Sequence, residues 1–292
     1  HSLPAPAAAP NRIDALRPGE WLEVPDSRLK KVAFEFPAGV KYTKNGLGVA
    51  AIINNWSGGA YDGKRDRLII WGGGHFAYGG NEFYGFDVNS LKWERLNDPS
   101  LKIDWDYHAG RDIYEDGTPR ACHTYGYIQY APSVDRFLSF GTVANFPKSF
   151  GGSRTWAFDF ESKTWEVKGE AMAYGIGAYS AVDPVTGRVF VRGNGKGTCL
   201  AEYDPLANEW TKRTGRVDGK TDYSKTADID PVGRCFVAAG GKKELKVLKF
   251  DIGAGAKTKQ EVVATKEPPV ALHAYSTVSS SLSLARASTE RP

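Results

Sequence analysis

Two groups of polar side chains in this sequence could do chemistry together. In the first, His75 follows three consecutive glycines at the end of an apolar stretch, and Tyr78, Asn81 and Glu82 follow within seven residues. Glycines at such a point let the backbone turn sharply and let a ligand come close. The group is expected to contact a sugar or a metal, although His75 and Asn81 could instead hold the loop through hydrogen bonds to the backbone.

The second group is Arg120, His123 and Tyr125, which lie just before another apolar stretch. A histidine or tyrosine can act as a general acid or base, and an arginine can neutralise the carboxylate of a uronate sugar. If His75 lies in the same pocket, the four side chains have the chemistry of a polysaccharide β-elimination. The alternative interpretation is that Arg-x-x-His opens a strand for structural reasons.

The elements that must position these side chains repeat along the chain. An aromatic residue followed by Asp occurs four times, and in three copies a Trp stands seven residues after the aromatic residue. The steps are Phe86-Asp87, Phe158-Asp159, Tyr203-Asp204 and Phe250-Asp251, and the Trp residues are Trp93, Trp165 and Trp210. Successive steps lie 72, 45 and 47 residues apart. A period of about 46 residues fits a blade of four strands.

A turn that ends in Arg precedes the second strand of each repeat. Asp, Pro and Gly in these turns suit tight hairpins, and the expected second strands are 68–71, 137–140, 189–191 and 235–237. The repeats predict an all-β propeller of four to five four-stranded blades, incomplete at the C-terminus, within residues 18–278. Asn55 and Trp56 hold the repeat position in the first blade that Arg120 to Tyr125 hold in the second, so they are expected to help bind substrate.

Several segments fall outside the repeats. Residues 1–17 are expected to be a flexible Ala/Pro leader and residues 279–292 a disordered tail, and a fifth repeat could begin at Ala271. Residues 18–24 resemble the outer strands that open on Trp, so they are expected to pair with the last blade and close the ring. The polar segment 101–118 is expected to be a loop inserted between blades. Its acidic residues between 104 and 116 could bind calcium, although a solvated loop is the simpler interpretation.

The glycine cluster after the second strand, the aromatic-Asp step and the spaced Trp resemble kelch-type propellers, the group that includes galactose-oxidase-like domains. The resemblance covers residues 46–255 and implies the fold, but the fold hosts enzymes, glycan binders and adhesion scaffolds alike. Copper oxidases of this group have an Arg-x-Tyr-His stretch that supplies copper ligands. Here the stretch is Arg120-Ala121-Cys122-His123, so copper is not expected, and no cofactor is predicted.

Composition and cysteine usage narrow the choice of partners. The chain carries a net charge of +4 without a dense run of Lys or Arg, so nucleic acid is not an expected partner. No apolar run is long enough for a membrane span. None of the three cysteines lies in a CxxC pair, and their odd number leaves at least one thiol free unless two chains pair. They are Cys122, Cys199 and Cys235.

These observations lead to three hypotheses for function. The first is a secreted, periplasmic or cell-surface propeller that binds or acts on carbohydrate through a polar pocket on one face. The second is a non-catalytic structural or adhesion module of a cell-surface or phage assembly. The third is a lyase that acts on an acidic polysaccharide with His75, His123, Tyr125 and Arg120. Two chains could also associate to complete the ring.

Overall fold

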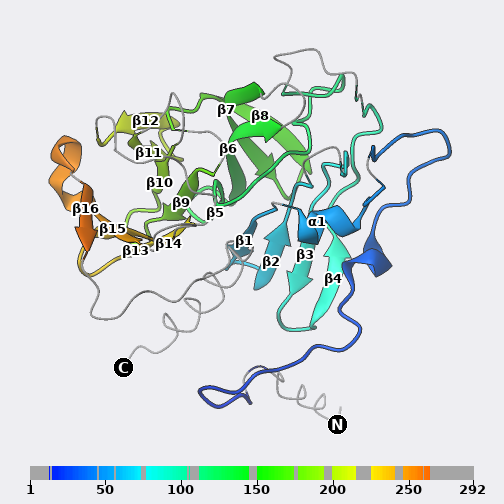
Figure 1. Ribbon diagram of the computed structural model, residues 1–292, viewed down its shortest axis with the longest axis horizontal. Coiled ribbons are helices and arrows are strands. Elements are labelled where there is room, and N and C mark those ends of the chain that lie inside the picture. The colour runs from blue at the N-terminus through cyan, green and yellow to red at the C-terminus, as the bar shows by residue number, and fades with distance from the viewer. Residues whose placement is uncertain are drawn as a thin grey trace, which may run out of the picture.

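The computed structural model describes residues 13, 15–44, 46–55, 57–73, 77–103, 105, 112–144, 150–173, 177–193, 199–214, 225–240, 246–258 and 260–263. They form four antiparallel sheets of four strands each, arranged as the blades of a propeller (Figure 1). In each sheet the strands lie in sequence order, so neighbouring strands of a blade are consecutive in the chain. The expected all-β propeller with four four-stranded blades is confirmed.

The strands have similar bounds from blade to blade. The first blade contains β1 (Gly59–Asp62), β2 (Arg67–Ile70), β3 (Tyr84–Asp87) and β4 (Lys92–Arg95), and the second contains β5 (Ile128–Ala131), β6 (Arg136–Ala144), β7 (Phe150–Asp159) and β8 (Thr164–Glu170). The third contains β9 (Tyr179–Val182), β10 (Val189–Arg192), β11 (Leu200–Asp204) and β12 (Glu209–Lys212). The fourth contains β13 (Lys225–Asp230), β14 (Cys235–Gly240), β15 (Lys246–Asp251) and β16 (Gln260–Val263), with the 3₁₀ helix η3 (Ile252–Lys257) before β16. Two short helices, η1 (Leu29–Val32) and α1 (Ala50–Asn54), precede the first blade.

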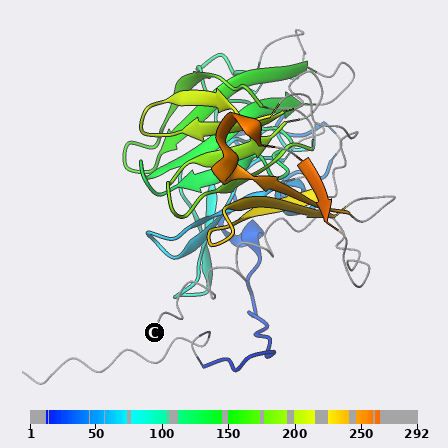
Figure 2. The same cartoon turned by 90° about the vertical axis from the view of Figure 1, so that its left-hand side faces the viewer.

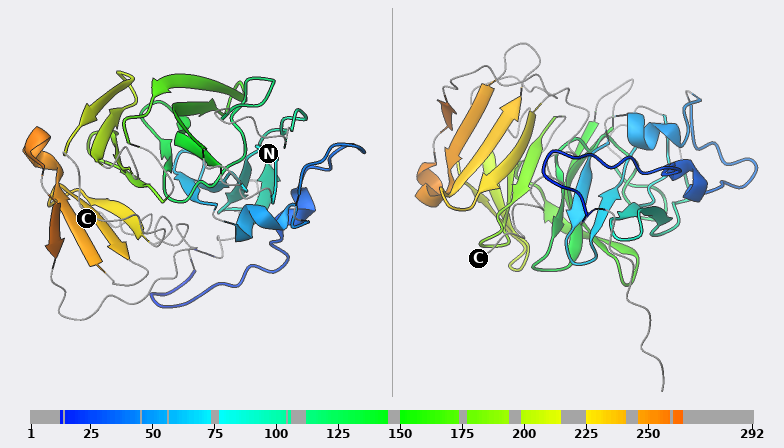
Figure 3. Two further views of the ribbon diagram at one scale, coloured as in Figure 1. Left: turned by 45° about the horizontal axis from the view of Figure 1, so that its top comes forward. Right: turned by 90° about the horizontal axis from the view of Figure 1, so that it is seen from below.

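The first strand of each blade is the innermost one. Contacts join β1 to β5, β5 to β9, and β9 to β13, so the blades follow one another in sequence order around an arc. Figures 2 and 3 show this succession from the first blade, in blue and cyan, to the fourth, in orange. The segment that leads into β5 also meets the start of β9, because Gly126 forms a parallel bridge with Tyr179.

The aromatic-Asp step forms the hairpin between the third and fourth strands. The Asp side chain accepts hydrogen bonds from backbone N–H groups of the turn: Asp87 from Ser90, Asp159 from Glu161 and Ser162, and Asp204 from Leu206 and Ala207. Side chains that hold a turn in this way favour Asp at the position. The turn then places the aromatic residue and the Trp opposite each other in register: Phe86 and Trp93, Phe158 and Trp165, and Tyr203 and Trp210.

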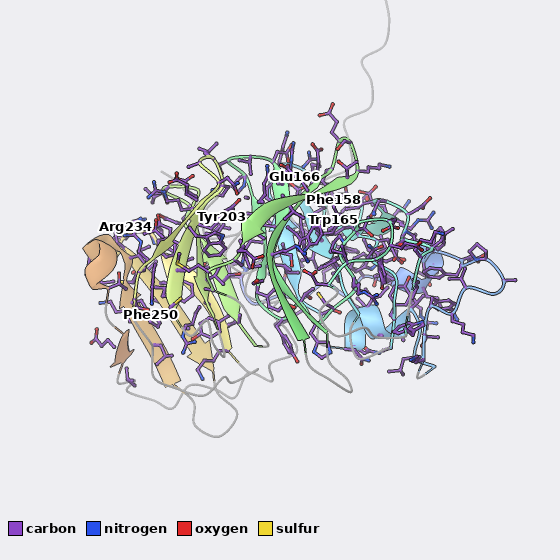
Figure 4. The ribbon with its side chains drawn as sticks, turned by 90° about the horizontal axis from the view of Figure 1, so that it is seen from above. Phe158, Trp165, Glu166, Tyr203, Arg234 and Phe250 are labelled. Carbon is purple, nitrogen blue, oxygen red and sulfur yellow. The ribbon has the colours of Figure 1, made fainter. Side chains whose placement is uncertain are left out.

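These aromatic pairs are packing residues. Their ring centroids lie 5.2, 5.2 and 5.1 Å apart in the first, second and third blades. Figure 4 labels Phe158 and Trp165, which lie together in the second blade. In the fourth blade the residue opposite Phe250 is Gln260, so this blade lacks the Trp.

Apolar clusters fill the spaces between neighbouring blades. The first joins residues such as Trp71 and Phe83 to Ile128 and Phe137, the second joins Leu138 and Phe140 to Val189 and Val191, and the third joins Phe190 and Leu200 to Phe236 and Phe250. All three cysteines are buried free thiols. The second and third blades each take part in two of these clusters and the fourth in one, so each blade is stabilised by packing against a neighbour.

A segment before the blades covers the outer side of the first blade. We call residues 29–54 the N-terminal cap. Its Leu29, Ile52 and Phe36 pack against Ile70 and Tyr84 of the first blade in a fourth apolar cluster. The cap takes the place that a further blade has in a closed ring.

The expected closing strand at 18–24 is wrong. These residues form no strand, Trp21 is 95% exposed, and the fourth blade uses its own β16 as outer strand. All four strands of the fourth blade therefore come from its own part of the chain. The proposed fifth repeat, the tail 279–292 and residues 1–12 of the leader lie outside the described residues and stay predictions. Within the described part of the chain, no helix has the length and apolar character of a membrane span.

Candidate functional site

The segments that carry the two predicted groups of polar residues lie next to each other. The chain after β2 lies against the segment that leads into β5: the backbone N–H of Gly73 donates to the Cys122 carbonyl over 3.3 Å. The hydroxyl of Thr124, which is fully buried, donates to the Trp71 carbonyl and accepts from the N–H of Gly58. His75 and Trp56 lie outside the described residues, so their place in a shared pocket stays a prediction.

His123 and Tyr125 form a hydrogen-bonded pair in front of β5. The Nδ1 atom of His123 lies 3.2 Å from the Tyr125 hydroxyl oxygen, and the two rings meet edge to face with centroids 5.5 Å apart. The His123 side chain is fully buried, whereas Tyr125 is half-buried. Tyr125 is therefore the more accessible member of the pair.

The backbone of Tyr125 sets this pair apart. Its φ is +38°, in the left-handed region that residues other than glycine rarely adopt. Among the described residues other than glycine, seven more have a positive φ. Asp26 lies in a turn of the N-terminal segment. The other six lie in hairpin turns between strands of one blade: Asp66, Leu91, Asp135, Lys163, Asn208 and Arg234. Tyr125 alone among them lies where a connection between two blades enters an innermost strand.

Arg120 is held by its own neighbourhood. Its side chain is nearly buried, its Nε donates to the Ile113 carbonyl over 3.0 Å, and its guanidinium lies 5.0 Å from the centre of the Tyr114 ring. Tyr114 is itself buried and donates its hydroxyl proton to the Gly79 carbonyl. Arg120 thus anchors the segment 112–120 beside the first blade.

Asn81 holds the loop after β2, as the structural interpretation expected. Its side-chain amide donates to the Thr118 hydroxyl and the Pro119 carbonyl, both over 2.8 Å, and its side-chain oxygen accepts from the Ser100 N–H. Only 2% of the residue is exposed. Asn55, at the end of α1, is half-buried, and its carbonyl accepts a hydrogen bond from the Ser57 hydroxyl.

Glu82 lies at the centre of a buried group of tyrosines. Its Oε1 accepts hydrogen bonds from the hydroxyls of Tyr78 and Tyr84, and the Tyr84 hydroxyl accepts one from the Phe34 N–H of the cap. All three side chains are almost fully buried. Burial raises the pKa of Glu82, and the tyrosine hydrogen bonds lower it by less. Burial and the nearby Glu82 carboxyl also raise the pKa of Tyr78 and of Tyr84.

The acidic segment 104–116 is partly internal. Asp112 is 1% exposed and forms an ion pair with Arg154 of β7, and an added Cβ on Gly152 would collide with its carboxylate. The expectation of a wholly solvated loop is therefore wrong at Asp112. Residues 104 and 106–111 lie outside the described part. Among the residues that the structure describes, no group of three or more His, Cys, Asp or Glu is placed to hold a metal ion.

Residues of the third blade also adjoin this site, and the sequence patterns did not single them out. Ser180 of β9 donates its hydroxyl proton to the Gly126 carbonyl over 2.6 Å, and its own oxygens accept from Gln129. Tyr179 forms a bridge with Gly126. The available signal was that Ser180 lies near the start of an innermost strand, at the repeat position that Ile128 holds in the second blade.

The comparisons add no family to this description. No family model matches the chain, and no curated protein is significantly similar to it.

Proposed function

We propose that this protein is a kelch-type propeller, secreted or periplasmic, that binds or acts on carbohydrate, with Tyr125 and His123 as its acid–base pair. The observation that supports the proposal is the left-handed backbone of Tyr125, which turns its hydroxyl back to the buried His123. Backbone strain of this kind is concentrated at functional sites. The pair also flanks residues that contact two other blades: Thr124 accepts from Gly58 before β1, and Gly126 bridges to Tyr179 of β9.

The chemistry best suited to the pair is β-elimination from a uronate sugar in an acidic polysaccharide. His123 takes the hydroxyl proton of Tyr125, and the tyrosinate removes the proton from the carbon next to the uronate carboxylate. The electron pair of that C–H bond forms the new C=C bond while the bond to the leaving sugar oxygen breaks. Tyr125 gives the proton to that oxygen and is again a tyrosinate.

Neutralisation of the uronate carboxylate is the role proposed for Arg120. Its guanidinium is nearly buried against Tyr114, so this role requires the 112–120 segment to open when substrate binds. His75 could contribute from the neighbouring loop.

A second candidate function is a non-catalytic structural or adhesion module. The specific observation in its favour is that Asn81, Glu82 and His123 are all buried, and that Asn81 and Glu82 bond within the protein. In this interpretation Asn81 holds the segment before the second blade, Glu82 holds the first blade to its cap, and the conformation of Tyr125 serves only packing.

The test removes one oxygen atom from the site. Tyr125→Phe keeps the ring and deletes the hydroxyl, and Tyr130→Phe is a matched control. Tyr130 lies at the other end of β5, where its hydroxyl donates to Asp135. Each protein is incubated with a panel of acidic polysaccharides while the ultraviolet absorbance of the unsaturated product is followed. We expect absorbance to rise with the wild type and with the control. With Tyr125→Phe, the rate of this rise should be lower by about a hundredfold or more.

Binding measurements separate the remaining outcomes. Glycan binding without any product supports a lectin-like module and excludes the elimination. Equal activity of the wild type and Tyr125→Phe excludes the acid–base role of the tyrosine. Neither binding nor product on any glycan contradicts the carbohydrate proposal and favours the structural module.

A further inference from the structure

The N-terminal segment contains a strand sequence that has no strand partner in the described structure. Glu20-Trp21-Leu22-Glu23-Val24 has the pattern of the outer strands that open on Trp, yet residues 20–24 belong to no sheet. Trp21 is 95% exposed, which is extreme for so large an apolar side chain, while Leu22 and Val24 are half-buried. Alternation of this kind is typical of an extended chain that lies against a sheet on one side.

The four blades differ in how their outer edges are protected. Each outer strand has one side that no described strand pairs with, and such edges invite pairing with another chain. The edges β4 and β12 consist of Lys-Trp-Glu-Arg and Glu-Trp-Thr-Lys, and β8 also carries three charged residues. Charged side chains discourage strand addition. The fourth edge, β16, reads Gln-Glu-Val-Val and carries a single charge.

The edge of β16 also exposes an apolar side chain. Val262 is 57% exposed, and it lies opposite Leu248 on the side of the sheet that faces the third blade. A further strand beside β16 would cover this valine. The segment 20–24 has five residues, which is long enough to pair with the four residues of β16.

We propose that residues 20–24 of one copy of the chain add as a fifth strand to the outer edge of β16 in a second copy, with Trp21 packed over Val262. Main-chain hydrogen bonds give such an addition its affinity, and the side chain in contact with the edge gives it specificity. Trp is the side chain that gains most from burial at an interface of this kind.

The arrangement of one copy favours a second copy as acceptor. The chain after residue 24 is fixed at Leu29, which is buried in the N-terminal cap on the first blade. In Figures 1 and 2 the segment before the cap runs in dark blue below the blades, while β16 lies in orange at the far end of the arc. Each copy then carries one donor strand and one acceptor edge, so the contact is head-to-tail and can extend beyond a dimer.

The experiment measures molar mass by sedimentation over a concentration series for the wild type, Trp21→Ser and Val262→Lys. The first variant removes the donor side chain, and the second places a guarding charge on the acceptor edge. We expect the wild type to assemble as concentration rises, and each variant to need about tenfold or more protein to do so. Val232→Ser is the matched control, because Val232 is 92% exposed in a turn of the fourth blade. It should assemble like the wild type.

Mixing the two variants gives the sharpest result. Trp21→Ser retains an intact edge and Val262→Lys an intact donor, so an equal mixture should form a heterodimer that cannot grow further. A wild type that stays monomeric throughout overturns the proposal. The fluorescence of Trp21 is obtained as the difference between the wild type and Trp21→Phe. If acrylamide does not quench this emission in the monomer, the strand has closed onto its own chain, and the proposal is also overturned. Assembly of both variants at wild-type concentrations also overturns it.

Discussion

Glu82 ties three separate parts of the chain together through one buried carboxyl group. Tyr78 comes from the loop after β2, Tyr84 from β3, and the Tyr84 hydroxyl accepts the N–H of Phe34 in the N-terminal cap. The charge of Arg95 in β4 lowers the pKa of Glu82, but by less than burial raises it. Burial in the protein therefore makes Glu82 harder to ionise than a carboxyl group in water.

This raised pKa predicts how stability depends on pH. A group whose pKa rises on folding contributes its full stability below the unfolded pKa and loses it as pH rises through the folded pKa. Urea unfolding of the wild type should therefore weaken from about pH 5 upward, with a slope of up to about 1.4 kcal/mol per pH unit. Glu82→Gln, which is neutral at every pH, should flatten that slope. Glu94→Gln, at a half-exposed side chain, should leave the slope unchanged, and parallel curves for Glu82→Gln and wild type contradict the assignment.

At the scale of single residues, the sequence indicated which polar side chains lie near the glycines. It did not predict their hydrogen-bond partners. Asn81 takes its partners from Ser100, Thr118 and Pro119, which lie 19, 37 and 38 residues further along the chain. No local pattern announces contacts of that range. The left-handed backbone of Tyr125 was equally hidden, because tyrosine has no preference for it.

The strands followed from turn chemistry, and their ends did not. The expected second strands 68–71, 189–191 and 235–237 correspond to β2, β10 and β14 with shifts at their ends. The stretch 137–140 is part of β6, which runs on to Ala144. Gly141 reads as a break in the sequence, but its positive φ of 80° accommodates a bulge between Phe140 and Thr142, and pairing with β7 continues beyond it.

One of the turns that end in Arg joins the fourth blade to the third. Arg234, in the first turn of the fourth blade, donates two hydrogen bonds of 2.7 and 2.6 Å to the two carboxylate oxygens of Asp183 in the third blade. Burial works to raise the pKa of Asp183, but the hydrogen bonds from Arg234 and Thr186 outweigh it and lower that pKa. Figure 4 labels Arg234 at this end of the fourth blade.

Arg234→Gln should therefore destabilise the protein by about 2 kcal/mol at neutral pH, because a buried carboxylate loses its charged partner. Since a lowered pKa contributes stability above the unfolded pKa, the difference from wild type should shrink as pH falls below about 4. Thermal unfolding between pH 3 and 7 measures both effects.

Arg136→Gln serves as the comparison. Arg136 has the same repeat position but pairs with Asp159 inside its own blade, and both side chains are partly exposed. Its loss should cost about 1 kcal/mol or less. Equal effects of the two variants would mean that the clasp between blades adds nothing to the ordinary turn.

The four described blades could be predicted from the sequence, and the way the first blade is covered could not. Repeats of an aromatic residue, Asp and Trp are local, so they count sheets directly. The side of the first blade is covered instead by the N-terminal cap, whose sequence resembles no repeat and whose contacts reach from Leu29 to Tyr84. The segment 18–24 resembles an outer strand, so the sequence predicts a ring closed within one chain. The structure contradicts this prediction, because residues 18–24 form no strand.

If the cap is a separate unit laid on the first blade, it should open without the blades. Leu29→Ala truncates a cap side chain that is 6% exposed where the cap meets the first blade. We expect the free energy of unfolding to fall by about 2 kcal/mol. The loss should fall on the cap first, because the blade clusters do not include Leu29. Limited proteolysis should then cut residues 20–45 faster, while amide exchange in β5 to β12 stays at the wild-type rate. Leu206→Ala, at a turn residue that is 72% exposed, should change neither measurement. Faster exchange in all four blades together would show instead that the cap and the propeller fold as one cooperative unit.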